Sequence, residues 1–216
     1  MRRLFLTLIL LVPVITAFSQ SDAKAVKILE DVSKKTRSFK NISAEFIFSL
    51  ENKEMDINEK NRGSIKINDE KYVVDLPDIG IKVYSDGETI WNYMEDGNQV
   101  TISKIEEQGS DLMDPSAIFN IYEKGFESSY IGEITRSNQV LHEIELYPGK
   151  EGYDISKVVI YINKNTMMIS SAVLYGTDGN LYGIEVKDID TDIDLPDSFF
   201  VFNKSEFGDV EVIDFR

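Results

Sequence analysis

The sequence predicts a mainly β protein, in which about eleven antiparallel strands curl into a half-barrel under a lid of helices. Three observations support this fold class. Many segments alternate apolar and polar residues, short turns rich in Asp, Asn and Gly separate them, and two other segments have helical periodicity. Alternation indicates strands with one buried face, and tight turns between such strands favour an antiparallel order.

The first nineteen residues have the features of a cleavable secretory signal peptide. Two arginines precede an apolar run over residues 4–18, and small residues stand just before Gln20. This run is shorter than the roughly 18–20 residues that a membrane-spanning helix needs. We therefore expect residues 1–19 to be removed after export and residues 20–216 to form a single soluble domain.

An amphipathic helix is expected directly after the signal peptide. Ser21 or Asp22 can cap it by accepting hydrogen bonds from the free N–H groups of the first turn. The helical pattern ends near Arg37. Its apolar positions include Val26, Leu29 and Val32.

A second, short helix is expected from Pro115 to Glu123. Asp114 can cap its N-terminus, and proline suits the first helical position because the N–H that it lacks has no helical partner there. Gly125 ends the pattern. The apolar stripe of this helix includes Ile118, Phe119 and Tyr122.

The strands occupy most of the remaining sequence, and no repeat or linker divides them. The predicted strands are Ile42–Leu50, Gly63–Ile67, Lys71–Leu76, Ile81–Ser85, Thr89–Tyr93, Gln99–Ser103, Ser128–Thr135, Gln139–Tyr147, Ile155–Asn163, Met167–Tyr175 and Leu181–Asp190. The apolar run Phe199–Phe202 is expected to add an edge strand.

Charge and composition exclude several classes of function. The chain has 38 acidic and 23 basic residues, a net charge of -15, one His and no Cys. This acidity argues against binding nucleic acid or anionic lipid headgroups, which need clustered Lys and Arg. The absence of Cys excludes disulfides, Cys-ligated zinc and a thiol nucleophile, and a single His excludes a multi-His metal site. We expect no metal, no cofactor and no catalytic residues.

The inward side of such a curled sheet is predicted to be aromatic and aliphatic. About eight strands already enclose space for side chains or one small ligand, and more strands enclose more. The helices could cover an apolar cavity, or they could fill the hollow and leave an ordinary core, and both interpretations stay open. The inward candidates are Phe46, Phe48, Leu50, Tyr72, Val74, Leu76, Trp91, Tyr93, Val158, Ile160 and Ile162.

One segment, Ser85-Asp86-Gly87-Glu88-Thr89-Ile90-Trp91-Asn92-Tyr93, resembles the signature hairpin of the periplasmic outer-membrane lipoprotein carriers of the LolA type. Other segments on both sides of it also match, in the same order along the chain as in that family. They are Ser38-Phe39, Ala44-Glu45-Phe46, Gly63, Tyr72, Asp114–Phe119 and Asp197–Phe202. The resemblance covers most of residues 22–216. It implies an unclosed antiparallel β-barrel of about eleven strands with an α-helical lid, as in LolA and LolB.

The resemblance also implies a periplasmic chaperone and not an enzyme. Such a carrier would take acylated lipoproteins from an inner-membrane ABC transporter and pass them to the outer membrane, where the acceptor is left open. It would act as a monomer without a cofactor. The acyl-binding residues would be Phe46, Phe48, Leu50, Tyr72, Val74, Leu76, Trp91, Tyr93, Val158 and Ile160, and the lid residues Val26, Leu29, Val32, Ile118, Phe119 and Tyr122.

One stretch departs from the family pattern. Many carriers place an Arg-Pro pair after the strand that bears Gly63, whereas this chain has Ile67-Asn68-Asp69-Glu70. In the family that Arg hydrogen-bonds toward the lid, so we expect lid control, and with it the transporter and acceptor partners, to differ here. The alternative is therefore a lipid- or glycolipid-binding protein of the same fold that acts on another cargo. A hydrolase based on paired carboxylates has no motif in its support.

Overall fold

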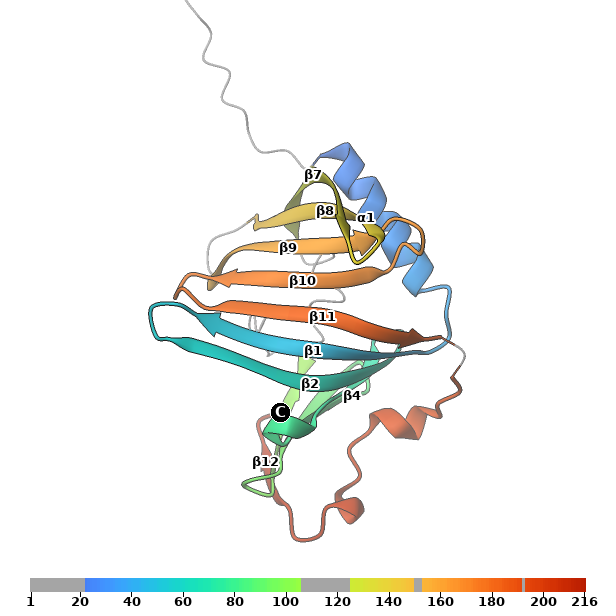
Figure 1. Cartoon of the computed structure of the whole chain (residues 1–216). Coiled ribbons are helices and arrows are strands. Elements are labelled where there is room, and N and C mark those ends of the chain that lie inside the picture. Colours follow the sequence, from blue (N-terminus) through green and yellow to red (C-terminus); the bar gives the residue numbers. More distant parts are fainter. Residues whose placement is uncertain (1–21, 106–124, 150–152, 192) are drawn as a thin grey trace, which may run out of the picture.

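The computed structural model describes residues 22–105, 125–149, 153–191 and 193–216. Two predictions lie outside these ranges: the signal peptide, and the helix Pro115–Glu123 with its lid residues Ile118, Phe119 and Tyr122. Within the described ranges the chain forms the α-helix α1 (Ala23–Thr36) and one sheet of 12 strands (Figure 1). The mainly β prediction is therefore confirmed.

Every strand predicted by alternation is present, and β2 begins well before the predicted Gly63. The strands are β1 (Ile42–Asn52), β2 (Ile57–Asn68), β3 (Lys71–Leu76), β4 (Ile81–Ser85), β5 (Thr89–Met94), β6 (Gln99–Lys104), β7 (Phe126–Arg136), β8 (Gln139–Pro148), β9 (Ile155–Asn163), β10 (Ile169–Gly176), β11 (Leu181–Asp190) and β12 (Glu211–Asp214). Short 3₁₀ turns are η1 (Pro77–Ile79), η5 (Asp197–Phe200) and η6 (Lys204–Glu206).

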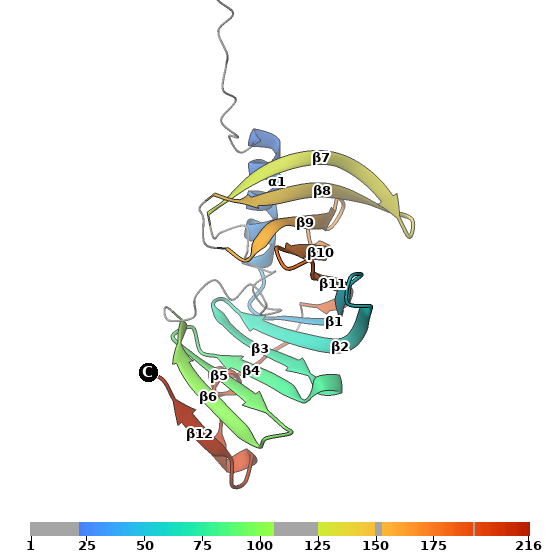
Figure 2. The same ribbon diagram turned by 90° about the vertical axis from the view of Figure 1, so that its left-hand side faces the viewer.

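The strand order in the sheet is β12-β6-β5-β4-β3-β2-β1-β11-β10-β9-β8-β7. Neighbouring strands are antiparallel except that β12 lies parallel to β6. The pairing of β1 with β11 joins two meanders into one sheet, whose edges are β12 and β7. Figure 2 shows the sheet bending between these edges without closing, as the unclosed-barrel prediction requires.

Helix α1 begins and ends where the sequence predicts. The Asp22 carboxylate caps it by accepting a 2.7 Å hydrogen bond from the Lys24 backbone N–H. The backbone N–H of Asp22 also donates to the Ser128 carbonyl oxygen of β7, which fixes the helix to that edge of the sheet. The buried residues of α1 are Ala25, Ile28, Leu29 and Val32.

The prediction that Val26 lies on the underside of the lid is wrong. Its side chain is 38% exposed, whereas Ala25, Ile28 and Leu29 are buried against the sheet. Each helical residue advances about 100° around the axis, so Val26 lies off the stripe that these three residues form. Leu29 and Val32 do face the sheet, as predicted.

The register between strands defines two faces of the sheet. Residues directly opposite one another in neighbouring strands point to the same side. We call the side that α1 packs against the inner face and the opposite side the outer face. The main hydrophobic core lies on the inner face, where it joins α1 to β1–β5 and β8–β11.

The outer face of β3–β6 carries a second core, which is covered by residues 195–210, called here the C-terminal segment. We call this core the outer aromatic cluster. Its buried members are Val73, Tyr84, Trp91, Val100, Ile102, Phe200 and Val210, with Tyr93, Leu195, Phe199, Phe202 and Phe207 packed against them.

The expected edge strand at Phe199–Phe202 is wrong. Asp197–Phe200 instead forms η5, which begins after Pro196, and the Phe200 side chain is buried in the outer aromatic cluster. The run therefore anchors the C-terminal segment through its side chains and does not pair with a strand. The edge position is taken by β12, which pairs in parallel with β6.

Candidate functional site

The candidate site is the apolar inner face from β9 across β1 to β4. All the predicted acyl-binding residues except Trp91 and Tyr93 lie on this face. The buried ones are Phe46, Val74, Leu76, Val158 and Ile160, and the half-buried ones are Phe48, Leu50 and Tyr72. That these residues bind acyl chains stays a prediction.

The placement of Trp91 and Tyr93 in the inner site is wrong. Trp91 lies opposite Tyr84 of β4 and Ile102 of β6, and both belong to the outer aromatic cluster. Strand β5 is apolar on both sides, because Ile90 packs in the inner core while Trp91 faces outward. Alternation therefore cannot choose between the two faces of this strand. The choice is made by the C-terminal segment, which covers Trp91 from far along the chain.

Strand β11 supplies inner-face residues that the sequence analysis missed. Tyr182, Ile184 and Val186 lie opposite the inward residues of β1. Ile184 is buried, whereas Tyr182 and Val186 are half-buried and pack on the inner core. The signal that could have found them is the alternation within the predicted strand Leu181–Asp190. Other half-buried residues that pack on this core are Ile67, Ile81 and Ile189.

One part of the inner face is closely packed around a glycine. Gly63 of β2 lies opposite Phe46 of β1, and a Cβ atom at Gly63 would stand 2.5 Å from the Phe46 ring and 2.7 Å from the Leu76 side chain. The Phe46 ring therefore occupies the space that a side chain would need. Two residues along β1, Phe48 is only half-buried, so the packing of this face loosens along the strand.

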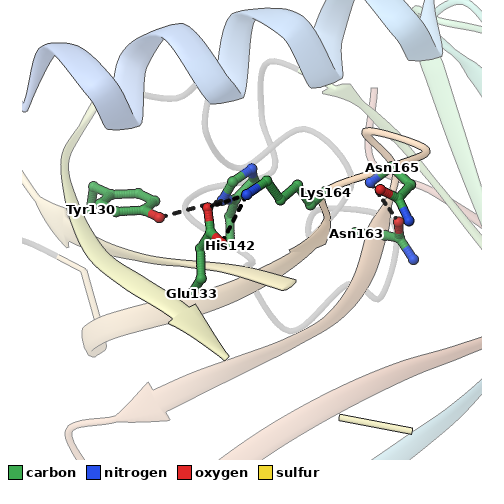
Figure 3. A network of polar contacts seen from close by, with 6 residues as sticks. All are labelled: Tyr130, Glu133, His142, Asn163, Lys164 and Asn165. Carbon is green, nitrogen blue, oxygen red and sulfur yellow. Dashed lines mark hydrogen bonds and ion pairs between the residues drawn. The ribbon is translucent and has the colours of Figure 1, made fainter. Parts of the chain in front are cut away.

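A polar network lies beside α1, at the end of the inner face formed by β7 and β8 (Figure 3). It consists of Tyr130, Glu133, His142 and Lys164, and we call it the His142 corner. His142 of β8 lies opposite Glu133 of β7, and its Nδ1 is 3.7 Å from a Glu133 carboxylate oxygen and 3.5 Å from the Tyr130 hydroxyl oxygen. The Lys164 ammonium donates to the same carboxylate at 2.7 Å. From α1, the Lys24 ammonium lies 3.6 Å from the centre of the Tyr130 ring.

The pKa values of His142 and Glu133 are both lowered, for different reasons. Desolvation lowers the pKa of His142, and the nearby Glu133 carboxylate only partly opposes that shift. The hydrogen bond from Lys164 lowers the pKa of Glu133, so that this carboxylate stays ionised. The neutral imidazole is therefore the form that the fold favours.

The described residues offer apolar contact area more than ligating groups. In the ranges that the structure covers, no group of three or more His, Asp or Glu side chains could hold a metal ion. Over those same ranges, no helix has the length and apolar character that crossing a membrane requires. The chemistry that the inner face does support is the burial of aliphatic chains against aromatic and branched side chains.

An unclosed, bent sheet with a helix packed on its apolar inner face is the architecture of a LolA-like fold. The family model described as "Outer membrane lipoprotein carrier protein LolA" matches residues 37–203, and the chain belongs to this family. No curated protein matches the sequence.

Two solved structures share this fold at low sequence identity. An uncharacterized conserved protein from Thermus thermophilus matches with a TM-score of 0.61 and 14% identity, over 88% of this chain and 99% of that protein. A DUF1329 family protein from Desulfovibrio piger matches with a TM-score of 0.52 and 13% identity, over 84% of this chain and 98% of that protein. At such identities the likeness shows the fold alone.

Proposed function

We propose that this chain is a periplasmic chaperone that binds the acyl chains of lipoproteins and carries them from the inner to the outer membrane. Its family, described as that of the outer membrane lipoprotein carrier protein, supports this proposal. The observation that carries it is the incompletely covered inner face, where Phe48, Tyr72 and Tyr182 are only half-buried on an otherwise closed core.

The chemistry of the inner face suits acyl chains. Taking a sixteen-carbon chain out of water gains roughly 12 kcal/mol at about 0.8 kcal/mol per CH₂, so an acylated protein does not cross an aqueous compartment unaided. Aromatic rings cover much of such a chain at little cost in conformational entropy. Shielding of this kind forms and breaks no covalent bond, so the proposed carrier is not an enzyme.

The proposal extends to export and partners. Residues 1–19 would direct export and be removed, and residues 20–216 would act as a single-domain monomer without a cofactor. Cargo would arrive from an inner-membrane ABC transporter and leave for an acceptor at the outer membrane. Helix α1, with Leu29 and Val32 on its underside, would form the part of the lid that the structure describes.

The alternative is a carrier of another lipid or glycolipid on the same inner face. The turn between β2 and β3 favours this alternative, because the stretch Ile67-Asn68-Asp69-Glu70 lacks the Arg-Pro pair that many family members place after this strand. Asp69 adopts a left-handed φ of 52°, as tight hairpin turns require. This turn has no guanidinium to hold a lid, so cargo would be retained and released by other contacts.

Mass spectrometry of co-purified cargo tests the proposal. The full chain is produced in an exporting host, purified without detergent and extracted for lipoproteins and lipids. Triacylated lipoprotein would support the carrier proposal, and free glycolipid would support the alternative. A protein that carries neither, and that also fails to bind palmitate in solution, would overturn both.

A pair of neighbouring substitutions on β1 connects the cargo to the inner face. Phe48→Asn removes a half-buried inner ring, and Ile47→Asn is the matched control because Ile47 is half-buried on the outer face. Burying one Phe side chain is worth about 1.5–3 kcal/mol, so we expect Phe48→Asn to retain roughly tenfold less acylated cargo. Ile47→Asn should retain nearly all of it. Equal losses in both variants would contradict the choice of face.

A further inference from the structure

The inner face changes from apolar to uncharged polar side chains toward β6. Directly opposed residues form rows that cross the sheet from β1 to β6. One row consists of Ala44, Ile65, Val74, Val83, Asn92 and Thr101. The next row consists of Ile42, Ile67, Tyr72, Ser85, Ile90 and Ser103. Both rows begin with apolar side chains on β1 and β2 and end with uncharged polar side chains on β6.

Three of these residues form what we call the neutral polar strip: Asn92 of β5 with Thr101 and Ser103 of β6. Each is half-buried. Within the part of the chain that the structure describes, none of the three side chains has a hydrogen-bond partner. Among the described residues, only the Asn41 amide oxygen is both fully buried and without a hydrogen-bond partner, so the polar atoms of the strip remain accessible to water. A ligand that covers them has to replace their hydrogen bonds to water with its own.

The strip also lacks charge. The inward positions of β5 and β6 are Ile90, Asn92, Met94, Gln99, Thr101 and Ser103, and none of these is charged. Gln99 differs from the strip in having a partner, since it donates to the Glu211 carboxylate of β12 at 3.5 Å.

The His142 corner differs from the neutral polar strip in how its polar groups are paired. It also borders the apolar inner face, but its charged groups satisfy one another, with Lys164 donating to Glu133 at 2.7 and 2.9 Å. The charged groups of the corner therefore pair with one another, whereas the side chains of the neutral polar strip have no hydrogen-bond partner among the described residues. The strip is the end of the inner face that can bind the polar part of an amphipathic ligand.

We propose that the neutral polar strip binds the uncharged head of the acylated cargo, meaning the glyceryl-ester and amide groups beside the acyl chains. The chains themselves lie over the apolar rows of β1–β4. This inference rests on the proposed carrier function. Adjacent strands are about 4.8 Å apart, so Thr101 lies roughly 10 Å from Val83, and one ligand can contact the strip and the apolar rows together.

The side chains of the strip fit a neutral head better than an anionic one. Asn offers both donors and an acceptor, and the two hydroxyls donate or accept, which complements esters, amides and hydroxyl groups. A phosphate is held best by Arg or Lys, which the inward positions of β5 and β6 do not provide. The chain's net charge of -15 further disfavours an anion.

A binding experiment with three probes tests this assignment. The probes are a synthetic dipalmitoylglyceryl-cysteine peptide, dipalmitoyl phosphatidate with the same acyl chains, and palmitate. The test variant Asn92→Leu/Thr101→Val removes the hydrogen-bonding groups of two strip residues while keeping the branched shape of each side chain. The control Thr89→Val makes the second of these changes on the outer face of β5, opposite Lys104.

We expect the double variant to bind the lipopeptide roughly tenfold more weakly than the unchanged chain, and palmitate within twofold. Thr89→Val should leave both affinities unchanged, and the unchanged chain should prefer the lipopeptide to the phosphatidate. Unaltered lipopeptide affinity in the double variant, or a preference for phosphatidate, would overturn this inference alone. If the unchanged chain binds neither lipopeptide nor palmitate, the proposed carrier function fails instead.

Discussion

Apolar side chains lie on both faces of β3–β5, but the chain covers the two faces to different extents. On the outer face the C-terminal segment closes over the sheet, and its Phe202 ring packs against the rings of Tyr84, Tyr93 and Phe207 at centroid distances of 4.6–6.1 Å. On the inner face Tyr72 of β3 and Ile81 of β4 are left half-buried. Because β3–β5 carry apolar residues on both faces, the difference in burial comes from which part of the chain lies on each face.

This difference separates a structural core from a candidate binding surface. On the outer face the sheet residues Tyr84, Trp91 and Val100 are buried beneath the aromatic residues of the C-terminal segment, so they contribute to stability and are not accessible to a ligand. A face with half-buried rings has apolar area that a ligand can still cover. Substitutions on the outer face should therefore affect folding, and substitutions of half-buried inner residues should affect cargo first.

The largest expected effect is that of Phe200→Ala in the outer aromatic cluster. Phe200 is 0% exposed, so its removal leaves a cavity under the C-terminal segment. We expect a loss of about 3–5 kcal/mol in the free energy of unfolding, measured by urea denaturation. Palmitate binding by the folded fraction should not change.

Phe215→Ala is the matched control for this prediction. The same side chain is removed from a position that is 64% exposed, so the free energy of unfolding should change by less than about 0.5 kcal/mol. If Phe200→Ala is as mild as Phe215→Ala, the C-terminal segment does not seal the outer face. If it abolishes palmitate binding while the protein stays folded, the division of roles between the faces is wrong.

Gly63→Ala should have an intermediate effect, because it tests the tightly packed part of the inner face. The new Cβ would stand 2.5 Å from the Phe46 ring, which is itself fully enclosed. Overpacking of this kind costs about 1–3 kcal/mol, again measured by urea denaturation. Gly132→Ala is the control, since a Cβ at Gly132 meets no atom within 4 Å. Similar stability of the two variants would show that the Phe46 ring moves freely.

Most of the sheet was predictable because its signals are local. Alternation and turn residues specify each of β1 to β11, and the Asp22 cap specifies the start of α1. Strand β12 was not predictable, because its parallel pairing with β6 joins residues that are far apart in sequence. Phe199–Phe202 has the composition of a buried strand, and only its packing in the outer aromatic cluster shows that it is not one.

The candidate site was predictable only as far as alternation selects a face. In β9, Val158, Ile160 and Ile162 share one parity and all lie in the inner core. In β5, Ile90 and Trp91 are both apolar, so the assignment depends on the distant C-terminal segment and was wrong. The neutral polar strip was also missed, because single polar residues in strands resemble ordinary solvent-facing positions until the register aligns them with the apolar rows.

The smallest expected effect concerns pH and the His142 corner. Burial lowers the pKa of His142 below the ordinary value of 6.5, so between these two values the unfolded chain binds more protons than the native one. Stability should therefore fall as the pH drops below about 6.5. His142 is the only histidine, and the charged and titratable groups around it are Glu133 and Tyr130 from β7, Lys164 after β9 and Lys24 from α1.

Urea denaturation of the unchanged chain and of His142→Gln at pH 7.5 and pH 5.5 measures this contribution. The unchanged chain should lose more stability than the variant over this interval, because glutamine does not titrate. Glu133, whose pKa is lowered by Lys164, loses its contribution only below its ordinary value of 4.5, outside this interval. Equal losses of stability in the unchanged chain and the variant would contradict this prediction. They would mean that the fold accepts a protonated His142, because water reaches its imidazole.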